Sequence, residues 1–481
     1  MILTNLGSVL VDHQDYEAAA SVLTRAIALD PQHAYAIALL AHCRARLCAW
    51  DGLAELHAQL LRQTDAGDDS VNAFIALSLP LSPAAQLRIA RRWARDLSPV
   101  LAPTARRVSV PATRSRLRLG YVSSDFRTHA LASLLTEVWE RHDRTRVETY
   151  AYSIGPRESS PLRARIEAAF DQFADCADED VERTAQRIRA DDIDVLIDLN
   201  GYTTHARSEI FALRPAPVQL QWLGYLGTLG AEHIDYIITD RFATPTDQQP
   251  FFTERFLDLP DCYCPSDTRR EIAARAPTRA ESGLPEQGFV YCCFNDAYKI
   301  LPEVFDVWMR LLEQVPASVL WLSPGRAVAI ANLQREAATH GIDPARLVFA
   351  PRVPLPQHLG RHAHADLFLD TMPYNAGATA NDALFMGLPV LTCAGATMAS
   401  RVAGSQLHAI GLPELVTANL GDYEALALEL ATTPELLHSY RERLRANRAT
   451  HPLFDMARFA RGLEDGLTSA WRDYTARMSS A

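Results

Sequence analysis

Two successive series of short apolar runs place the strongest constraint on how this chain folds. The runs are rich in β-branched and aromatic residues, and helical stretches lie between several of them. The first series occupies residues 116–122, 147–153, 193–199, 218–224 and 235–240. The second series occupies residues 289–295, 318–322, 346–350, 366–370 and 389–392. Because strands that alternate with helices are typical of parallel, doubly wound sheets, the pattern predicts an α/β protein with two Rossmann-like lobes.

The segments around these runs set the predicted domain boundaries. We expect helical repeats at 1–65 and a helical linker at 66–112. A first lobe at 113–275 and a second lobe with C-terminal helices at 276–481 should follow. A charged, proline-containing stretch near 266–286 joins the lobes. Ligands of such sheets bind beyond the carboxyl ends of the strands, so two facing lobes would place a substrate cleft between them.

The first 65 residues resemble tetratricopeptide repeats. Residues typical of a 34-residue repeat occur at Leu6, Gly7, Tyr16, Ala18, Ala26 and Pro31. A second, degenerate unit follows 34 residues later, at Leu40, Ala41 and Trp50. Since a stack needs about three repeats to bury its faces, these helices must lean on the next domain or belong to a longer array. A plain helical hairpin without a binding role is the alternative.

Composition excludes several classes of protein. The net charge of −11 argues against a nucleic-acid partner, because proteins that bind phosphate backbones usually carry a basic face. The eight cysteines are scattered and lack the spacing of a zinc site or a disulfide framework. No apolar run reaches the roughly 18 residues of a membrane span, and the N-terminus lacks the features of a signal peptide. We therefore expect a cytoplasmic protein.

Lys299 is the only lysine among 47 basic residues. It follows the predicted strand 289–295, and therefore lies where ligands of parallel sheets bind. A lysine is a compact, mobile charge that suits a diphosphate leaving group. Because negative charge develops on such a group in the transition state, a positioned cation would accelerate its departure. A solvated surface lysine is the alternative.

A loop of small residues, Asn375 to Thr379, follows the predicted strand 366–370 and leads into a helix. Small side chains let backbone amides approach a ligand, and the N-terminus of the helix favours phosphate. Asp382 lies about one turn into this helix and could accept hydrogen bonds from ribose hydroxyls. A plain turn, with Asp382 as a partner of the helix dipole, is the alternative.

Three further segments carry candidate ligand-binding residues. Val353, His358 and Arg361 lie in a loop and short helix before strand 366–370, where an imidazole could stack on a pyrimidine. His129 follows the first strand and suits proton transfer near neutral pH, although a capping role at the following helix is the alternative. Gly227 and Thr228 offer backbone amides to a sugar or phosphate. No convincing acidic metal site is evident, and no metal cofactor is expected.

The segments that carry these residues resemble the protein O-GlcNAc transferase family. The resemblance covers most of residues 116–410 and rests on the phrases GYVSSDFRTH, LNGYTTHARSEIFALRPAPVQLQWLGYLGTLG, DYIITD, YCCFNDAYKILP, PASVLWL, LDTMPYNAGATANDALFMGLPVLT and MASRVAGSQL. It implies a GT-B arrangement of two Rossmann-like lobes, the first on the acceptor side and the second binding the UDP-sugar. It also implies transfer of GlcNAc from UDP-GlcNAc to Ser or Thr hydroxyls of proteins, with inversion and without a metal.

The resemblance assigns roles to individual residues. Lys299, with Tyr298 beside it, matches the diphosphate lysine of the family, and His358 matches the histidine that stacks on uracil. Arg361 matches a neighbouring arginine. Asp382 matches the ribose-binding aspartate of the family, and Thr379 matches a phosphate-contacting threonine. His129 matches a histidine proposed as base or donor-positioning residue.

The sequence departs from the family at the donor site. Gly377 and Ala378 replace a His-Thr pair of the animal enzymes, and Leu355 replaces a lysine that contacts the nucleotide. Asp296 replaces a glutamine and places a negative charge near the leaving group unless its side chain points away. These changes leave two alternatives open: a UDP-hexose transferase with another sugar or an Asn acceptor, and a nucleotide-binding tetratricopeptide scaffold with weak catalysis. The expected partners are a UDP-sugar and acceptor proteins, for which the N-terminal helices are a candidate surface.

Overall fold

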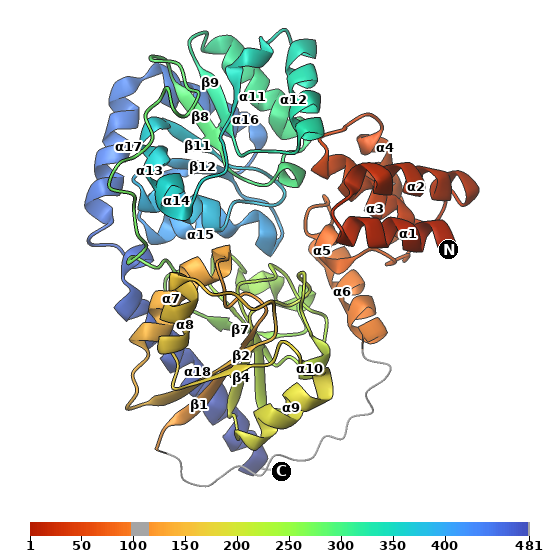
Figure 1. Cartoon of the computed structure of the whole chain (residues 1–481), viewed down its shortest axis with the longest axis vertical. Helices are drawn as coiled ribbons and strands as arrows, with labels where there is room; N and C mark the ends of the chain where they lie inside the picture. The colour runs from red at the N-terminus through yellow and green to blue at the C-terminus, as the bar shows by residue number, and fades with distance from the viewer. Residues whose placement is uncertain (98–114, 480–481) are drawn as a thin grey trace. The chain divides into compact units, whose positions relative to one another are not determined.

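The computed structural model describes residues 1–97 and 115–479, which divide into two compact units (Figure 1). Unit 1 comprises Met1–Ala85 and Arg270–Ala449, and unit 2 comprises the described parts of Gln86–Arg269 and Thr450–Ala481. Each unit contains one parallel sheet. The predicted α/β fold, with two Rossmann-like lobes and a helical N-terminal segment, is confirmed.

The sheet of unit 2 has seven parallel strands in the order β3-β2-β1-β4-β5-β6-β7. The strands are β1 (Leu117–Ser123), β2 (Val147–Ser153), β3 (Gln172–Asp175), β4 (Val195–Asp198), β5 (Val218–Gln221), β6 (Tyr236–Thr239) and β7 (Arg255–Asp258). The helices of this unit are the greater part of α6 (Pro83–Leu97), then α7 (Ala130–Arg141), α8 (Pro161–Ala168), α9 (Val181–Ala190), α10 (Glu209–Ala212), η1 (Thr246–Phe251), η7 (Pro452–Phe454) and α18 (Met456–Ser479). Central strands β4 and β5 are buried along their whole length, as expected for a sheet covered on both faces.

The sheet of unit 1 has six parallel strands in the order β10-β9-β8-β11-β12-β13. The strands are β8 (Val290–Cys293), β9 (Val319–Leu322), β10 (Leu347–Phe349), β11 (Leu367–Leu369), β12 (Val390–Cys393) and β13 (Val416–Thr417). Its helices are η2 (Ala297–Lys299), α11 (Pro302–Gln314), α12 (Ala327–Thr339), η3 (Pro344–Arg346), α13 (Leu355–Arg361), η4 (His362–His364), α14 (Ala378–Phe385), η5 (Met398–Ser400), α15 (Val402–Ala409), η6 (Pro413–Leu415), α16 (Leu420–Thr432) and α17 (Pro434–Asn447). In both sheets the chain runs outward from a central strand and then returns to its other side, so β1 and β4, and likewise β8 and β11, flank the point where ligands of such folds bind.

The N-terminal helices pack against helices and the η2 turn of the second lobe within unit 1. They are α1 (Ile2–Asp12), α2 (Tyr16–Leu29), α3 (Ala34–Arg46), α4 (Leu53–Asp65) and α5 (Ala73–Ala76). Gly7 lets α1 and α2 approach closely, because a Cβ there would lie 2.6 Å from the Leu23 side chain. Trp50 packs edge-on against Phe305 of α11, with ring centroids 5.1 Å apart. The helices therefore pack on the neighbouring lobe. Such packing is one of the two arrangements expected for a repeat array too short to bury its own faces.

The structure divides the chain differently from the predicted domains. The first helical domain was predicted to end at 65, whereas unit 1 continues to Ala85. The second lobe was predicted to run to 481, whereas unit 1 excludes the residues from Thr450 onward. The predicted end of the linker, at 112, lies outside the described residues. The last helix, α18, packs on α7, β5 and β7 of unit 2. Three short strands, β3, β7 and β13, were not predicted; β3 and β7 have largely exposed side chains, and β13 has only two residues.

Candidate functional site

Lys299 lies in η2, directly after β8, and is half-buried. Its Nζ donates a hydrogen bond to the Asn375 carbonyl at 3.0 Å and lies 3.9 Å from the centre of the Tyr374 ring. Removal of the ammonium from water lowers the pKa of Lys299 to about 8, and the carboxylates of Asp370 and Asp296 limit this shift. Among the described residues, no carboxylate oxygen lies within 4.0 Å of this ammonium. Lys299 is therefore a partly desolvated cation, available to an anionic ligand.

Asp370, at the end of β11, organises the loop that faces Lys299. Its carboxylate accepts hydrogen bonds from the backbone N–H groups of Thr371 and Ala376 at 2.7 and 2.6 Å. Thr392 donates to its second oxygen at 2.6 Å, and Asn295 donates to the first at 3.2 Å. Burial raises the pKa of Asp370 to about 6. Sequence reasoning missed this residue because it ends an apolar run and has no side-chain pattern of its own.

The predicted turn of small residues leads into α14, while binding of phosphate there stays a prediction. Gly377 is the residue before the helix, and Gly377, Ala378 and Thr379 are each half-buried. The Thr379 hydroxyl donates to the Asn295 side-chain oxygen, which ties this helix to the end of β8. A Cβ at Gly377 would meet Val402 only at an ordinary 3.6 Å. The structure thus brings Lys299 and the 377–379 turn to the same end of one sheet.

Asp382 is buried in α14 and paired with Arg270, a residue that the sequence analysis did not select. Arg270 donates to the Asp382 carboxylate and, at 3.0 Å, to the side-chain oxygen of Asn381. Burial raises the pKa of Asp382, and the Arg270 cation opposes this shift. His358 Nε2 lies 4.0 Å from Asp382 Oδ2. The structure therefore brings together the two residues predicted to bind ribose and uracil.

The remaining residues predicted to bind the donor come from α13 and the loop before it. The half-buried His358 ring packs edge-on against Phe294, with centroids 5.2 Å apart, and burial lowers the pKa of His358 to about 3. The imidazole is therefore neutral and suited to stacking. Arg361 is buried, donates to the Pro351 carbonyl at 3.1 Å and has no hydrogen-bond partner at Nε. Val353 is half-buried in the preceding loop.

Tyr298 faces the N-terminal helices. Its buried ring lies below the Arg46 guanidinium, 4.1 Å away, and beside the His42 ring at 5.7 Å. The neighbouring Asp296 is exposed and forms an ion pair with Arg46. The Asp296 carboxylate thus has a cation partner in Arg46, so the negative charge that the sequence placed near the leaving group is paired. A ligand-binding role for Tyr298 stays a prediction, and the structure adds a packing role.

His129 in unit 2 is the N-cap of α7. Its Nδ1 accepts a hydrogen bond from the Leu131 N–H at 3.3 Å and lies 3.7 Å from Asp125 Oδ2. Burial lowers the pKa of His129, while Asp125 opposes the shift. Asn200, after β4, donates to Asp125 at 3.0 Å. In the neutral imidazole that accepts at Nδ1, the proton is on Nε2, so His129 presents a donor to any ligand.

The loop after β5 contains Gly227 and Thr228. Thr228 is buried and donates to Glu254 at 2.6 Å, and Glu254 also accepts from the Leu229 N–H at 2.6 Å. The Gly227 carbonyl accepts from the Gln221 side chain at 2.7 Å. Glu254 was not selected from the sequence. The Thr228 hydroxyl therefore stabilises the loop, while contact of either residue with a sugar stays a prediction.

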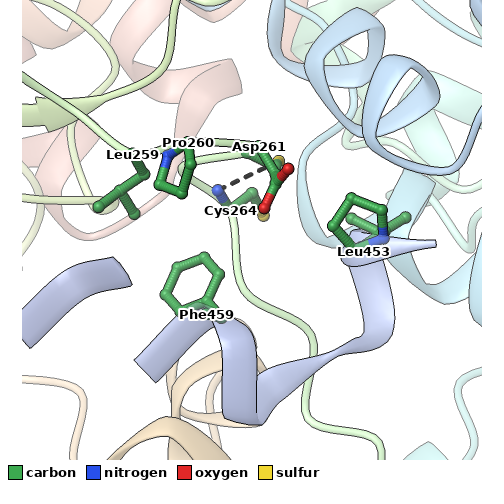
Figure 2. A pocket seen from close by; sticks show the side chains of 8 residues that line it. Leu259, Pro260, Asp261, Cys264, Leu453 and Phe459 are labelled. Atoms are coloured by element: carbon green, nitrogen blue, oxygen red, sulfur yellow. Dashed lines mark hydrogen bonds between the residues drawn. The ribbon is translucent and has the colours of Figure 1, made fainter. Parts of the chain in front are cut away.

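A small cavity lies elsewhere in unit 2, between the segment after β7 and the start of α18. Figure 2 shows Leu259, Pro260, Leu453 and Phe459 around it. Its volume of about 10 Å³ leaves room for about one water molecule and is far too small for a nucleotide. Within the described ranges, no three His, Cys, Asp or Glu side chains gather as a metal site would require. None of the helices in these ranges is both long enough and apolar enough to cross a membrane.

Comparisons with known proteins identify a family and several relatives of this chain. A family model described as glycosyl transferase family 41 matches residues 70–274 and 269–463. The probable UDP-N-acetylglucosamine–peptide N-acetylglucosaminyltransferase SEC of Arabidopsis thaliana is 35% identical over 452 residues, covering 90% of this chain and 46% of that protein. The corresponding enzyme of Caenorhabditis elegans is 29% identical, covering 85% of this chain and 46% of that protein. The chain thus spans about half the length of these curated relatives.

A solved structure is similar over the whole chain. It is a lysine-to-methionine mutant of the O-GlcNAc transferase of Thermobaculum terrenum, with a TM-score of 0.80 and 32% identity. The alignment covers 100% of this chain and 91% of that one.

Proposed function

Because the chain belongs to glycosyl transferase family 41, we propose that it transfers GlcNAc from UDP-GlcNAc to Ser or Thr hydroxyls of proteins, with inversion and without a metal. The relatives named as peptide N-acetylglucosaminyltransferases and as an O-GlcNAc transferase support this substrate pair. The observation that carries the proposal is the convergence of Lys299, the start of α14 and the His358–Asp382 pair at one end of the unit 1 sheet.

Each part of this convergence suits one part of UDP. The neutral His358 ring offers a face for stacking on uracil, and Asp382 can accept hydrogen bonds from ribose hydroxyls. The N–H groups at the start of α14 and the Lys299 ammonium suit the diphosphate. Since Lys299 and the helix dipole supply positive charge, the leaving group needs no metal ion in this proposal.

In the proposed reaction, the acceptor oxygen attacks the anomeric carbon as the bond from that carbon to the phosphate oxygen breaks. The electron pair of this bond moves to UDP, where Lys299 stabilises the new negative charge more strongly than in the substrate. The hydroxyl proton passes to a base. The Nδ1 hydrogen bond of His129 leaves Nε2 protonated, which favours a donor-positioning role for His129 over that of the base.

The proposed partners are acceptor proteins, with the N-terminal helices as a candidate binding surface, and the proposed location is the cytoplasm. The replacement of a His-Thr pair of the animal enzymes by Gly377 and Ala378 favours a second candidate, transfer of another UDP-hexose. The identity of the sugar decides between the two.

The test is mass spectrometry of host-cell proteins and synthetic peptides after incubation with UDP-GlcNAc or UDP-glucose. We expect a HexNAc mass increase on Ser or Thr with the first donor, retained in the presence of EDTA. Hexose addition instead, or addition to Asn, would establish the second candidate. UDP binding without transfer to any protein would contradict both and support a binding scaffold.

Substitution of Lys299 tests the leaving-group role. Lys299→Met should lower kcat at least about 100-fold, the usual range for removing one group that stabilises developing charge, while the fold stays intact. Arg25→Met is the matched control, because Arg25 is an exposed cation of α2. Initial rates with saturating UDP-GlcNAc, together with melting curves, measure the effect. Turnover within a few-fold of the unmodified chain would rule out the role.

A further inference from the structure

Arg46, the last residue of α3, connects the N-terminal helices to the turn that carries Lys299. Its guanidinium forms an ion pair with Asp296, the residue before η2, and lies 4.1 Å from the Tyr298 ring centre. Its Nε donates to His42 Nε2 at 3.3 Å. The Arg46 side chain is 19% exposed and the Asp296 side chain 57%, so Arg46 is the enclosed member of the pair.

The other side of the same turn faces the donor site. Lys299 donates to the Asn375 carbonyl, and Tyr298 and Tyr374 lie with ring centroids 6.0 Å apart. The turn is a 3₁₀ segment of three residues, so Asp296 and Lys299 lie within one turn of each other. The Asp296 carboxylate is also one of the groups that raise the Lys299 pKa, so its position bears on the electrostatics of Lys299.

We propose that Arg46 is a positioning residue for donor binding: it holds Asp296 in an ion pair away from the leaving group and thereby fixes the turn that presents Lys299. This inference rests on the proposed function, since it assigns the N-terminal helices a part in the same donor site. It also gives the Asp296 replacement a physical role, because the compensating cation comes from α3.

Other contacts hold the helices in place, so Arg46 can be tested without undocking them. Trp50 packs on Phe305, and Asn332 of α12 donates to the Leu47 carbonyl at 2.8 Å. These contacts do not involve Asp296 or Lys299. Removal of the Arg46 charge should therefore change donor binding rather than the packing of α3 on the lobe.

Three charged groups face Lys299 from the segments packed around it: Asp370, Asp296 and Arg46. The two carboxylates favour the protonated lysine, and Arg46 disfavours it. The neighbouring Cys293 thiol is neutral near pH 7, because burial raises its pKa. Loss of Arg46 should therefore raise the Lys299 pKa slightly, and loss of Asp296 should lower it.

Calorimetric titration of UDP into the full chain at pH 7 tests the proposal. Arg46→Met should weaken UDP binding by about three- to tenfold, because a partly exposed carboxylate then repels the diphosphate. Adding Asp296→Asn to this variant should restore most of the affinity. Arg46→Lys should lose less than Arg46→Met, and Arg25→Met should bind as the unmodified chain does. In turnover, Arg46→Met should raise the donor KM more than it lowers kcat.

A second measurement needs no ligand. Because Lys299 is the only lysine, ¹³C-lysine labelling yields one side-chain signal whose pH titration reports its pKa. We expect opposite shifts in Arg46→Met and Asp296→Asn, and a near-normal value in the double variant. Unchanged UDP affinity in Arg46→Met, or a double variant as weak as Arg46→Met, would overturn the proposal. Failure of the unmodified chain to bind UDP while the lysine signal shifts as expected would instead count against the proposed function.

Discussion

At the scale of single residues, the surroundings of Lys299 link its charge to the pH range in which the donor site works. Burial brings the Lys299 pKa down to about 8, whereas Asp370 titrates near 6 and the His358 imidazole near 3. Between pH 7 and 9, Lys299 is therefore the group of this cluster whose charge changes. A bound diphosphate favours the protonated lysine and raises its pKa, so UDP binding takes up a proton above pH 8.

The expected result is a decrease in UDP affinity of about tenfold between pH 7 and pH 9, because the pKa of free Lys299 lies within this range and the bound-state value lies above it. The phosphates of UDP are already ionised there, since their last pKa is near 6. Calorimetry at several pH values measures the effect. Lys299→Met should bind weakly with no such slope; an equal slope in that variant would show that another group titrates.

At the scale of elements, a buried set of hydrogen bonds joins α18 to the rest of unit 2. Glu464 of α18 accepts hydrogen bonds from His142 Nδ1 at 3.0 Å and from the Asp143 N–H at 2.8 Å. His142 Nε2 lies 2.8 Å from the Tyr121 hydroxyl of β1. Stacking of Phe459 on Trp222, with centroids 6.0 Å apart, adds apolar burial. Helix α18 thus completes the core of a lobe whose last strand, β7, ends as early as Asp258.

Glu464→Ala should lower the free energy of unfolding of unit 2 by about 3 kcal/mol, because it leaves buried donors without an acceptor. Asp465→Ala is the matched control, since the neighbouring Asp465 is 69% exposed and pairs with Arg146 at the surface. Its effect should stay below about 1 kcal/mol. Denaturant unfolding curves of both variants make the comparison, and equal losses would contradict a structural role for the buried contact.

At the scale of the whole molecule, unit 1 joins two segments that are far apart in sequence, Met1–Ala85 and Arg270–Ala449. The proposed donor residues Lys299, His358 and Asp382 all belong to this unit, and α3 lies against η2. A ligand of this site should therefore stabilise the N-terminal helices as well as the lobe that holds it.

Hydrogen exchange can test this coupling. UDP at about 100 times its Kd stabilises the binding unit by about 2.7 kcal/mol, so slow exchange in α3 should be protected together with β8 and α14. Strands of unit 2, such as β2, should gain less protection. Protection of β8 and α14 without any change in α3 would show that the N-terminal helices unfold independently of the donor site.

Much of the fold follows from local patterns. All ten predicted strand runs contain strands, because short runs rich in apolar, β-branched and aromatic residues that alternate with helices are typical of parallel sheets. Strands β3 and β7 escaped prediction because their side chains are mostly exposed, and β13 because two residues carry no period. The place of residues 450–481 also escaped prediction, since only packing against α7 shows which core a helix completes.

The sequence by itself determined the two doubly wound lobes and the helical start of the chain. It also identified Lys299, His358 and Asp382 as candidate ligand-binding residues. These features depend on periodicity and on residues that follow a strand, which local order encodes. Only the tertiary structure decided which charges pair at this site. Arg270 pairs with Asp382, and Arg46 pairs with Asp296, which lies 250 positions away in the sequence. Such pairs form because folding brings opposite charges from distant segments together and removes water from at least one of them, and no local sequence pattern predicts which segments will meet.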